Sequence, residues 1–168
     1  MYGFSNIYVA KKNGDKYATP VLIEGGKSVT VNLNYNYTEL KKGKYKTPVR
    51  FQEFAGGGGK LKLLGLSKEE YKLLFGCEVE DNKVKIKTTD KAPTLALMFT
   101  RKQLDGTEKG YCLYNIVCKP LNFDATTIEN GRIAEDSVEI EFFVNSKEED
   151  IYYIEENIDD SFFEQVKF

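Results

Sequence analysis

The residue types that most often perform chemistry are scarce in this chain. No histidine occurs among its 168 residues, which removes the commonest general base and the usual metal ligand. Its three cysteines, Cys77, Cys112 and Cys118, lack the spacing of a metal site. Glu139 and Glu141 are i, i+2 neighbours, but no pattern near them indicates a pocket. We therefore expect no enzyme, no metal and no cofactor.

The cysteines indicate a reducing compartment. Cys112 and Cys118 lie on one predicted strand, roughly 20 Å apart at about 3.3 Å per residue, so they cannot bridge each other while that strand is straight. We predict three reduced cysteines that act as small core residues. The chain has neither a signal-peptide pattern nor an apolar run that could cross a bilayer. We therefore expect a soluble protein made in the cytoplasm, without membrane contact.

Four consecutive glycines, residues 56–59, resemble a phosphate loop only superficially. They precede a predicted strand rather than a helix, and no Gly-Lys-Ser/Thr follows them. Lys60 and Lys62 alternate with Leu61 and Leu63 directly afterwards. We interpret the glycines as a loop that leads into a half-buried strand.

One helix is predicted, over about residues 67–75. Ser67 is a suitable N-cap, Glu70 completes a capping box, and Gly76 can end the helix in the left-handed conformation. The apolar side chains expected to pack against the rest of the molecule are Leu66, Tyr71, Leu74 and Phe75.

The clearest periodicity in the sequence lies in residues 28–37. Val29, Val31 and Leu33 alternate with polar residues, which predicts a strand with one buried face. The opposite side of this strand is polar but uncharged, and includes Ser28, Thr30, Asn32 and Asn34. Such a face suits either a wet enclosed surface or the simple β-compatibility of these residue types.

Most of the remaining chain also has strand patterns. Continuous apolarity in residues 94–100 and the run 110–119 predict the central hairpin of the core. Val138, Ile140, Phe142 and Val144 face one way in the strand 137–144. Further strands are predicted at residues 4–10, 20–23, 49–54, 77–80, 83–87 and 151–154. The fold class is mainly β, a β-sandwich with one flanking helix, in a single domain.

Charge divides the chain into two halves. Residues 1–87 carry 16 Lys and Arg against 9 Asp and Glu, whereas residues 88–168 carry 8 against 17. A solvated surface of mixed sign is one explanation. Head-to-tail contact between copies, with a basic face against an acidic one, is the other.

Two segments are especially rich in charge. Residues 38–48 are turn-rich and are interpreted as a long exposed loop; its candidate contact residues are Glu39, Lys41, Lys42, Lys44, Tyr45 and Lys46. The main domain is expected to span residues 1–146. Residues 147–168 form an acidic C-terminal arm whose docking residues are Phe162, Phe163, Val166 and Phe168. The arm can dock on its own domain or on a neighbouring copy.

The order of these elements resembles the major tail proteins, which build the tail tube of long, non-contractile phage tails and related prophage particles. The resemblance rests on GFSNIYVA and TPVLIEGG near the start, on GGGGKLKLLGLSKEEYKLLFG in the middle, and on TLALMFT, GYCLYNIVCKP and SVEIEFF towards the end. It covers nearly the whole chain through order and spacing rather than through one diagnostic motif. The lysines of the 38–48 loop and the long acidic tail depart from the family pattern.

The resemblance implies a structural virion protein in the particle's tail, assembled in the cytoplasm of a bacterial host. Six copies would close into a ring, with their sheets joined into an inter-subunit β-barrel that has no exposed edges. Rings would stack head to tail around a tape measure protein, and contact the tail terminator and the distal tail or baseplate proteins. The 38–48 loop would contact the next ring.

The resemblance also implies a bore through which double-stranded DNA passes without specific binding. Its lumen-facing residues would be Ser28, Thr30, Asn32, Asn34, Glu139 and Glu141. Such a bore would be hydrated and neutral to negative, so that a phosphate backbone slides past it. Two other functions remain open: the inner tube of a contractile tail, tailocin or secretion-like machine, and a monomeric β-sandwich binding module.

Overall fold

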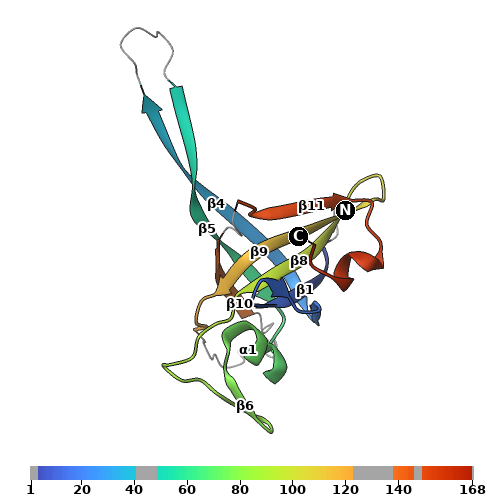
Figure 1. Cartoon of the computed structure of the whole chain (residues 1–168). Helices are drawn as coiled ribbons and strands as arrows, with labels where there is room; N and C mark the ends of the chain where they lie inside the picture. The colour runs from blue at the N-terminus through green and yellow to red at the C-terminus, as the bar shows by residue number, and fades with distance from the viewer. Residues whose placement is uncertain (1–3, 41–48, 123–137, 146–148, 168) are drawn as a thin grey trace, which may run out of the picture.

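The computed structural model describes residues 4–40, 49–122, 138–145 and 149–167. Strands dominate this part of the chain, and one α-helix and one short 3-10 helix accompany them. The sequence therefore predicted the fold class correctly. Figure 1 shows the strands crossing in a compact body, with one long hairpin projecting away from it.

Nine strands form one antiparallel sheet. Its order is β2-β1-β8-β9-β10-β5-β4, with β3 added to β1 and β11 added to β9. The bounds are β1 Phe4–Asn13, β2 Lys16–Tyr17, β3 Val21–Ile23, β4 Gly26–Leu40, β5 Val49–Leu63, β8 Leu95–Lys102, β9 Glu108–Cys118, β10 Val138–Val144 and β11 Tyr152–Glu156. Among the described residues, β2 and β4 at the two ends of this order do not pair with each other, so one chain does not close a barrel.

An irregularity at Asn115 divides β9 into two parts that pair with different strands. The first part of β9 pairs with β11, and its last residues, Ile116 to Cys118, pair with β10. Between these parts Asn115 has a φ of 46°, a left-handed conformation that Asn tolerates better than most residues. The Tyr17 hydroxyl lies 2.8 Å from the Asn115 side-chain oxygen and accepts from the Asn115 N–H at 3.1 Å. The bend places β4, β5 and β10 opposite β1 and β8.

The main core fills the space between these two layers. The buried residues from β1 and β8 include Ile7, Val9 and Leu97, and those from β5 and β10 include Leu61 and Phe142. The alternation predicted for residues 138–144 is confirmed, because Ile140, Phe142 and Val144 are buried while Glu139 and Glu141 are exposed.

The helix α1, Lys68–Phe75, is capped as predicted. The Ser67 hydroxyl accepts from the Glu70 N–H at 3.3 Å, and the Glu70 carboxylate accepts from the Ser67 N–H at 3.1 Å. Gly76 ends the helix with a φ of 70°. Beside α1, the predicted hairpin at Asp81-Asn82 forms from β6, Glu78–Glu80, and β7, Lys83–Lys85. No helix among the described residues has the length and apolarity needed to cross a membrane.

The prediction that residues 56–59 form a loop is wrong. These glycines lie inside β5, a strand of 15 residues. A Cβ atom on Gly59 would lie 2.3 Å from the Thr30 carbonyl oxygen and 2.4 Å from the Phe142 ring. The glycines therefore allow two neighbouring strands to approach closely, a tertiary requirement that local turn signals do not distinguish from a loop.

The predicted loop at 38–48 is also shorter than expected. Thr38, Glu39 and Leu40 belong to β4 and pair with β5, while residues 41–48 lie outside the described part of the chain.

The strand β1 is longer than predicted. It continues past residue 10 to Asn13, because its end pairs with β2 around a turn at Gly14.

Candidate assembly surfaces

The residues expected to face the lumen lie on one exposed surface. Ser28, Thr30, Asn32 and Asn34 project from β4, and Glu139 and Glu141 from β10. The strand β5 lies between them and aligns Lys62 with Ser28 and Glu139, and Lys60 with Thr30 and Glu141. We call these residues of β4, β5 and β10 the polar face.

Two lysines that sequence reasoning had not assigned, Lys60 and Lys62 of β5, lie within the polar face. The Lys60 ammonium is 3.0 Å from the Glu139 carboxylate and 4.0 Å from that of Glu141. The hydrogen bond and charge of Glu139 raise the pKa of Lys60. Lys119 also reaches Glu141, at 3.5 Å. The surface thus carries charges of both signs that lie within ion-pair distance of one another.

The alternation of Lys60 and Lys62 with buried Leu61 and Leu63 was a signal available in the sequence. It showed that the two lysines share one face of a strand. What it did not show is which strands lie on either side, since the pairing of β5 with β10 joins residues far apart in the chain.

A second surface is the projecting part of the β4–β5 hairpin, which we define as Tyr35–Leu40 with Arg50–Phe54. Figure 1 shows it extending well beyond the body. It carries large apolar side chains at high exposure: Tyr37 at 67%, Phe51 at 53% and Leu40 at 50%. Sequence reasoning had assigned contact here only to the residues of the 38–48 loop named above.

Of those loop residues, the structure describes Glu39 alone. Its carboxylate accepts a hydrogen bond from the Arg50 guanidinium at 2.8 Å, and both side chains are exposed. Lys41, Lys42, Lys44, Tyr45 and Lys46 lie outside the described residues.

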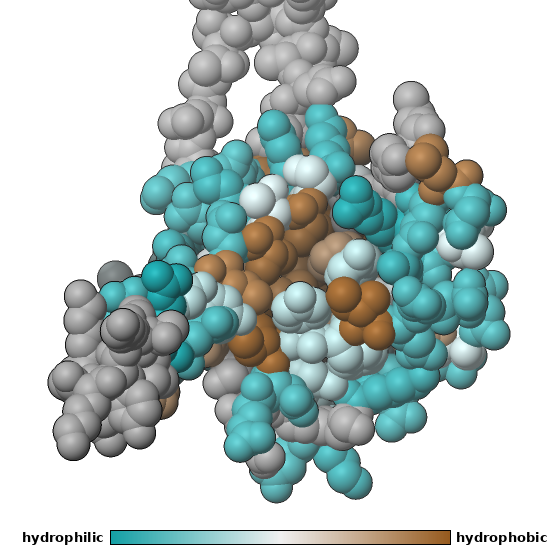
Figure 2. Space-filling model, turned by 90° about the horizontal axis from the view of Figure 1, so that it is seen from above, coloured by the Kyte–Doolittle hydropathy of each residue, from teal (hydrophilic) through white to brown (hydrophobic). Residues whose placement is uncertain are grey.

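A third surface is an open groove of about 590 Å³ between β4 and β11. Its apolar lining includes Val31 and Leu33 from β4, Phe99 from β8, Tyr111 from β9 and Tyr152 from β11. The rings of Phe99 and Tyr111 stack with centroids 5.2 Å apart. Seen from above, the molecule shows an apolar area enclosed by hydrophilic side chains on the side where β4 and β11 run (Figure 2).

The C-terminal arm, by contrast, packs on its own chain. The 3-10 helix η1, Asp160–Glu164, places Phe162 against a second cluster of buried residues from β1, β8 and β9. Phe162 and Val166 are each 2% exposed. Phe163 stacks on Tyr8 with ring centroids 4.1 Å apart. Phe168 lies outside the described residues.

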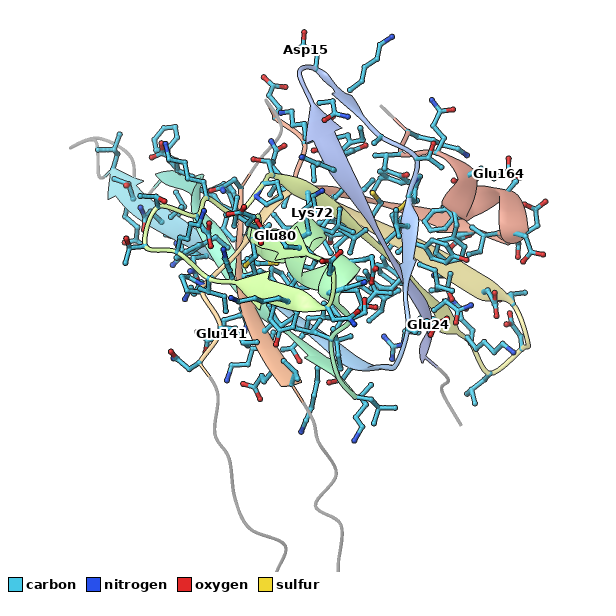
Figure 3. The ribbon with its side chains drawn as sticks, turned by 90° about the horizontal axis from the view of Figure 1, so that it is seen from below. Asp15, Glu24, Lys72, Glu80, Glu141 and Glu164 are labelled. Carbon is cyan, nitrogen blue, oxygen red and sulfur yellow. The ribbon has the colours of Figure 1, made fainter. Side chains whose placement is uncertain are left out.

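Hydrogen bonds hold the end of the arm as well. The Tyr114 hydroxyl donates to the Lys167 carbonyl oxygen at 2.6 Å, and the Lys167 ammonium lies 2.8 Å from the Glu155 carboxylate. In Figure 3, Glu164 on η1 and Glu141 on β10 appear on opposite sides of the view. The arm and the polar face therefore occupy different surfaces.

The helix side chains contact the main core. Leu74 and Phe75 are buried in it, and Leu66 and Tyr71 pack against it while partly exposed.

The three cysteines are buried and unbridged. In the described part of the chain, no group of three or more Cys, Asp or Glu residues could hold a metal ion.

Comparison with known proteins gives only distant structural likenesses. No protein-family model matches the sequence, and no curated protein sequence is significantly similar to it. The tube-terminating cap of the anti-feeding prophage covers 89% of this chain and 87% of its own, at 15% identity and a TM-score of 0.47.

Two parts of an extracellular contractile injection system, PVC, also align with this chain. A chain of its sheath–tube complex, in the extended state, has 13% identity and a TM-score of 0.47 over 89% of this chain and 87% of its own. A chain of its sheath/tube terminator has 13% identity and a TM-score of 0.45 over 89% and 92%.

Proposed function

We propose that this chain is a structural subunit that assembles with copies of itself into the tube of a phage tail or tail-like particle. The observation that carries the proposal is the projecting part of the hairpin, whose Tyr37, Phe51 and Leu40 are at least half exposed in the single chain. Exposed large apolar side chains gathered on one projecting element mark a surface that a protein partner covers.

The proposed assembly follows the pattern that the sequence resemblance implies. Six copies form a ring, and rings stack head to tail along the particle axis. The strand β4 lies at an end of the sheet order, so its outer edge is available for pairing with a neighbouring copy, and this would remove an exposed edge. The tape measure protein, the tail terminator and the distal tail or baseplate proteins are the further proposed partners.

The polar face suits the lining of the bore. Its two lysines are equal in number to its two glutamates, and Lys60 lies 3.0 Å from Glu139 and 4.0 Å from Glu141. A phosphate backbone that meets lysines already paired with carboxylates releases fewer counterions than one that meets free lysines, so it is held less strongly. Duplex DNA would pass along such a surface without being retained.

Light scattering after size-exclusion chromatography, with negative-stain electron microscopy, tests the proposal. Rings or tubes are expected from the purified full chain. A stable monomer at every accessible concentration would overturn the proposal and favour a monomeric binding module that uses the groove between β4 and β11. A sheath protein encoded beside this chain would assign the tube to a contractile tail, tailocin or secretion-like machine.

The charged loop has its own test. Substituting Lys41, Lys42, Lys44 and Lys46 together by Glu is expected to weaken stacking, because four charges change sign at the proposed ring-to-ring contact. Electron micrographs of particles carrying this variant should show short tubes or single rings. Tubes of normal length would show that these lysines do not take part in the contact between rings.

A further inference from the structure

Two surfaces described above complement one another in shape and chemistry. The groove between β4 and β11 has two walls, with Val31 and Leu33 on one and Tyr152 on the other, above the stacked rings of Phe99 and Tyr111. Ile154, on the same side of β11 as Tyr152, is 47% exposed. An apolar groove of this kind remains open in the single chain.

The projecting part of the hairpin presents apolar side chains on both of its faces. Tyr35 pairs with Phe54 in register, and their rings meet edge to face at 5.6 Å on one face. Tyr37 continues that face. Phe51, opposite Thr38, and Leu40, opposite Val49, belong to the other face.

A flat contact would cover only one face of this hairpin, whereas a two-walled groove covers both. We propose that the hairpin of one copy inserts into the groove between β4 and β11 of a second copy. This inference rests on the proposed self-assembly and names the two surfaces that carry it. Aromatic side chains buried in a pocket are the usual anchors of protein interfaces.

Charge favours the same occupant. Residues 38–48, at the end of the hairpin, contain four lysines and one glutamate, whereas residues 149–164 contain seven acidic residues and no lysine or arginine. The strand β11, which forms one wall of the groove, belongs to this acidic segment; its Glu156 lies on the same side as Tyr152 and Ile154 and 3.0 Å from Lys109, whereas Glu155 lies on the opposite side. Lys27 and Arg101 line the groove from β4 and β8.

The contact is heterologous, because donor and acceptor are different surfaces of the chain. Each bound copy still offers a free hairpin and a free groove, so assembly continues until a ring closes or a filament grows. A contact between two identical surfaces would instead stop at a dimer.

Two variants separate donor from acceptor. The donor variant carries Tyr37→Thr and Phe51→Thr, and the acceptor variant carries Tyr152→Thr and Ile154→Thr. All four side chains are at least 44% exposed, and Thr keeps the charge unchanged and suits a strand. The matched control is Ile86→Thr with Leu104→Thr, two side chains that are 70% and 78% exposed outside both surfaces.

Light scattering on full-length proteins gives the readout, with circular dichroism to check folding. We expect wild type and control to assemble, while each interface variant loses affinity by roughly 30-fold or more per anchor residue and remains monomeric. Mixed in equal amounts, the two variants should form a dimer that does not grow, because one supplies an intact hairpin and the other an intact groove.

Failure has distinguishable forms. If wild type is a monomer, the proposed function falls and this inference with it. If wild type assembles and either variant does so equally well, or if the mixture of variants remains monomeric, only the hairpin-in-groove contact is overturned.

Discussion

Two apolar surfaces of this chain differ in what covers them. On β1, β8 and β9, the cluster around Ala96, Met98 and Cys112 is covered by Phe162 and Val166 of the chain's own C-terminal arm. On the β4–β5 hairpin, Tyr37, Phe51 and Leu40 face solvent. We call the first the closed face and the second the open face. The closed face contributes to folding of the single chain, whereas the open face is available for association.

The comparison also changes the role expected of the arm. Sequence reasoning left open whether residues 147–168 dock on their own domain or on a neighbour. In the structure Phe162 lies directly against Gly110, where a Cβ atom would be 2.6 Å from the ring. The arm is therefore packed as part of the core, and the acidic residues around it remain on the surface.

The largest expected difference between the two faces comes from Phe162→Ala against Phe51→Ala. Phe162 is 2% exposed and Phe51 is 53% exposed. Removing a buried Phe side chain costs about 3–5 kcal/mol of unfolding free energy, while Phe51→Ala should leave that free energy of the monomer nearly unchanged and weaken association. Urea unfolding and light scattering measure the two quantities. Equal loss of stability in both variants would contradict the division into closed and open faces.

A smaller loss of stability is expected from Gly110→Ala. The added methyl group would push the Phe162 ring away from β9, and overpacking of this kind costs about 1–3 kcal/mol. Gly65→Ala is the matched control, since no atom lies within 4 Å of its Cβ position. The change in the midpoint of urea unfolding reports the difference. If the two variants unfold at the same urea concentration, Phe162 does not pack on Gly110 in solution.

Alkaline pH should loosen the closed face. Burial raises the pKa of Cys112 to about 12 and that of Tyr114 to about 12, above the ordinary values of roughly 8.5 for Cys and 10 for Tyr. The folded state therefore holds these protons more tightly than the unfolded state. The stability that the two protonated side chains contribute is fully present below their pKa in the unfolded state. It is lost as pH rises towards their pKa in the folded state.

The urea midpoint is therefore expected to fall as pH rises from about 8.5 towards 12. Thiol labelling is an independent measurement: Cys112 and Cys118, whose pKa burial raises to about 12, should react slowly in the native protein and quickly in urea, because the thiolate is the reactive species. Fast labelling of Cys112, the cysteine of the closed face, in the native protein would show that this face opens readily.

The smallest effect on stability is expected on the polar face. Glu139→Gln with Glu141→Gln removes the carboxylates beside Lys60, and exposed ion pairs contribute little to folding. The assembled protein should nevertheless retain more duplex DNA at low salt, because its lysines are no longer balanced. Glu24→Gln with Glu164→Gln changes the net charge equally on other surfaces. If both variants retain DNA equally in electrophoresis, the polar face does not line the bore.

Local patterns in the sequence were enough for several elements. The capping box of Ser67 and Glu70 specified the start of α1, and the alternation from Val138 to Val144 specified which residues of β10 are buried. Each depends on residues a few positions apart, so its physical cause is contained in one short segment. The turn at Asp81-Asn82 belongs to the same category.

Other features depend on segments far apart in the chain. The glycines 56–59 belong to a strand because Thr30 and Phe142 crowd them, and Lys60 is balanced because β10 pairs beside β5. The open face arises because the hairpin projects beyond the body of the molecule (Figure 1). The sequence by itself determined the fold class, the helix and the buried positions of single strands, since these follow from local periodicity and capping. Only the tertiary structure decided which strands are neighbours, and hence which apolar faces the chain covers and which it leaves for a partner.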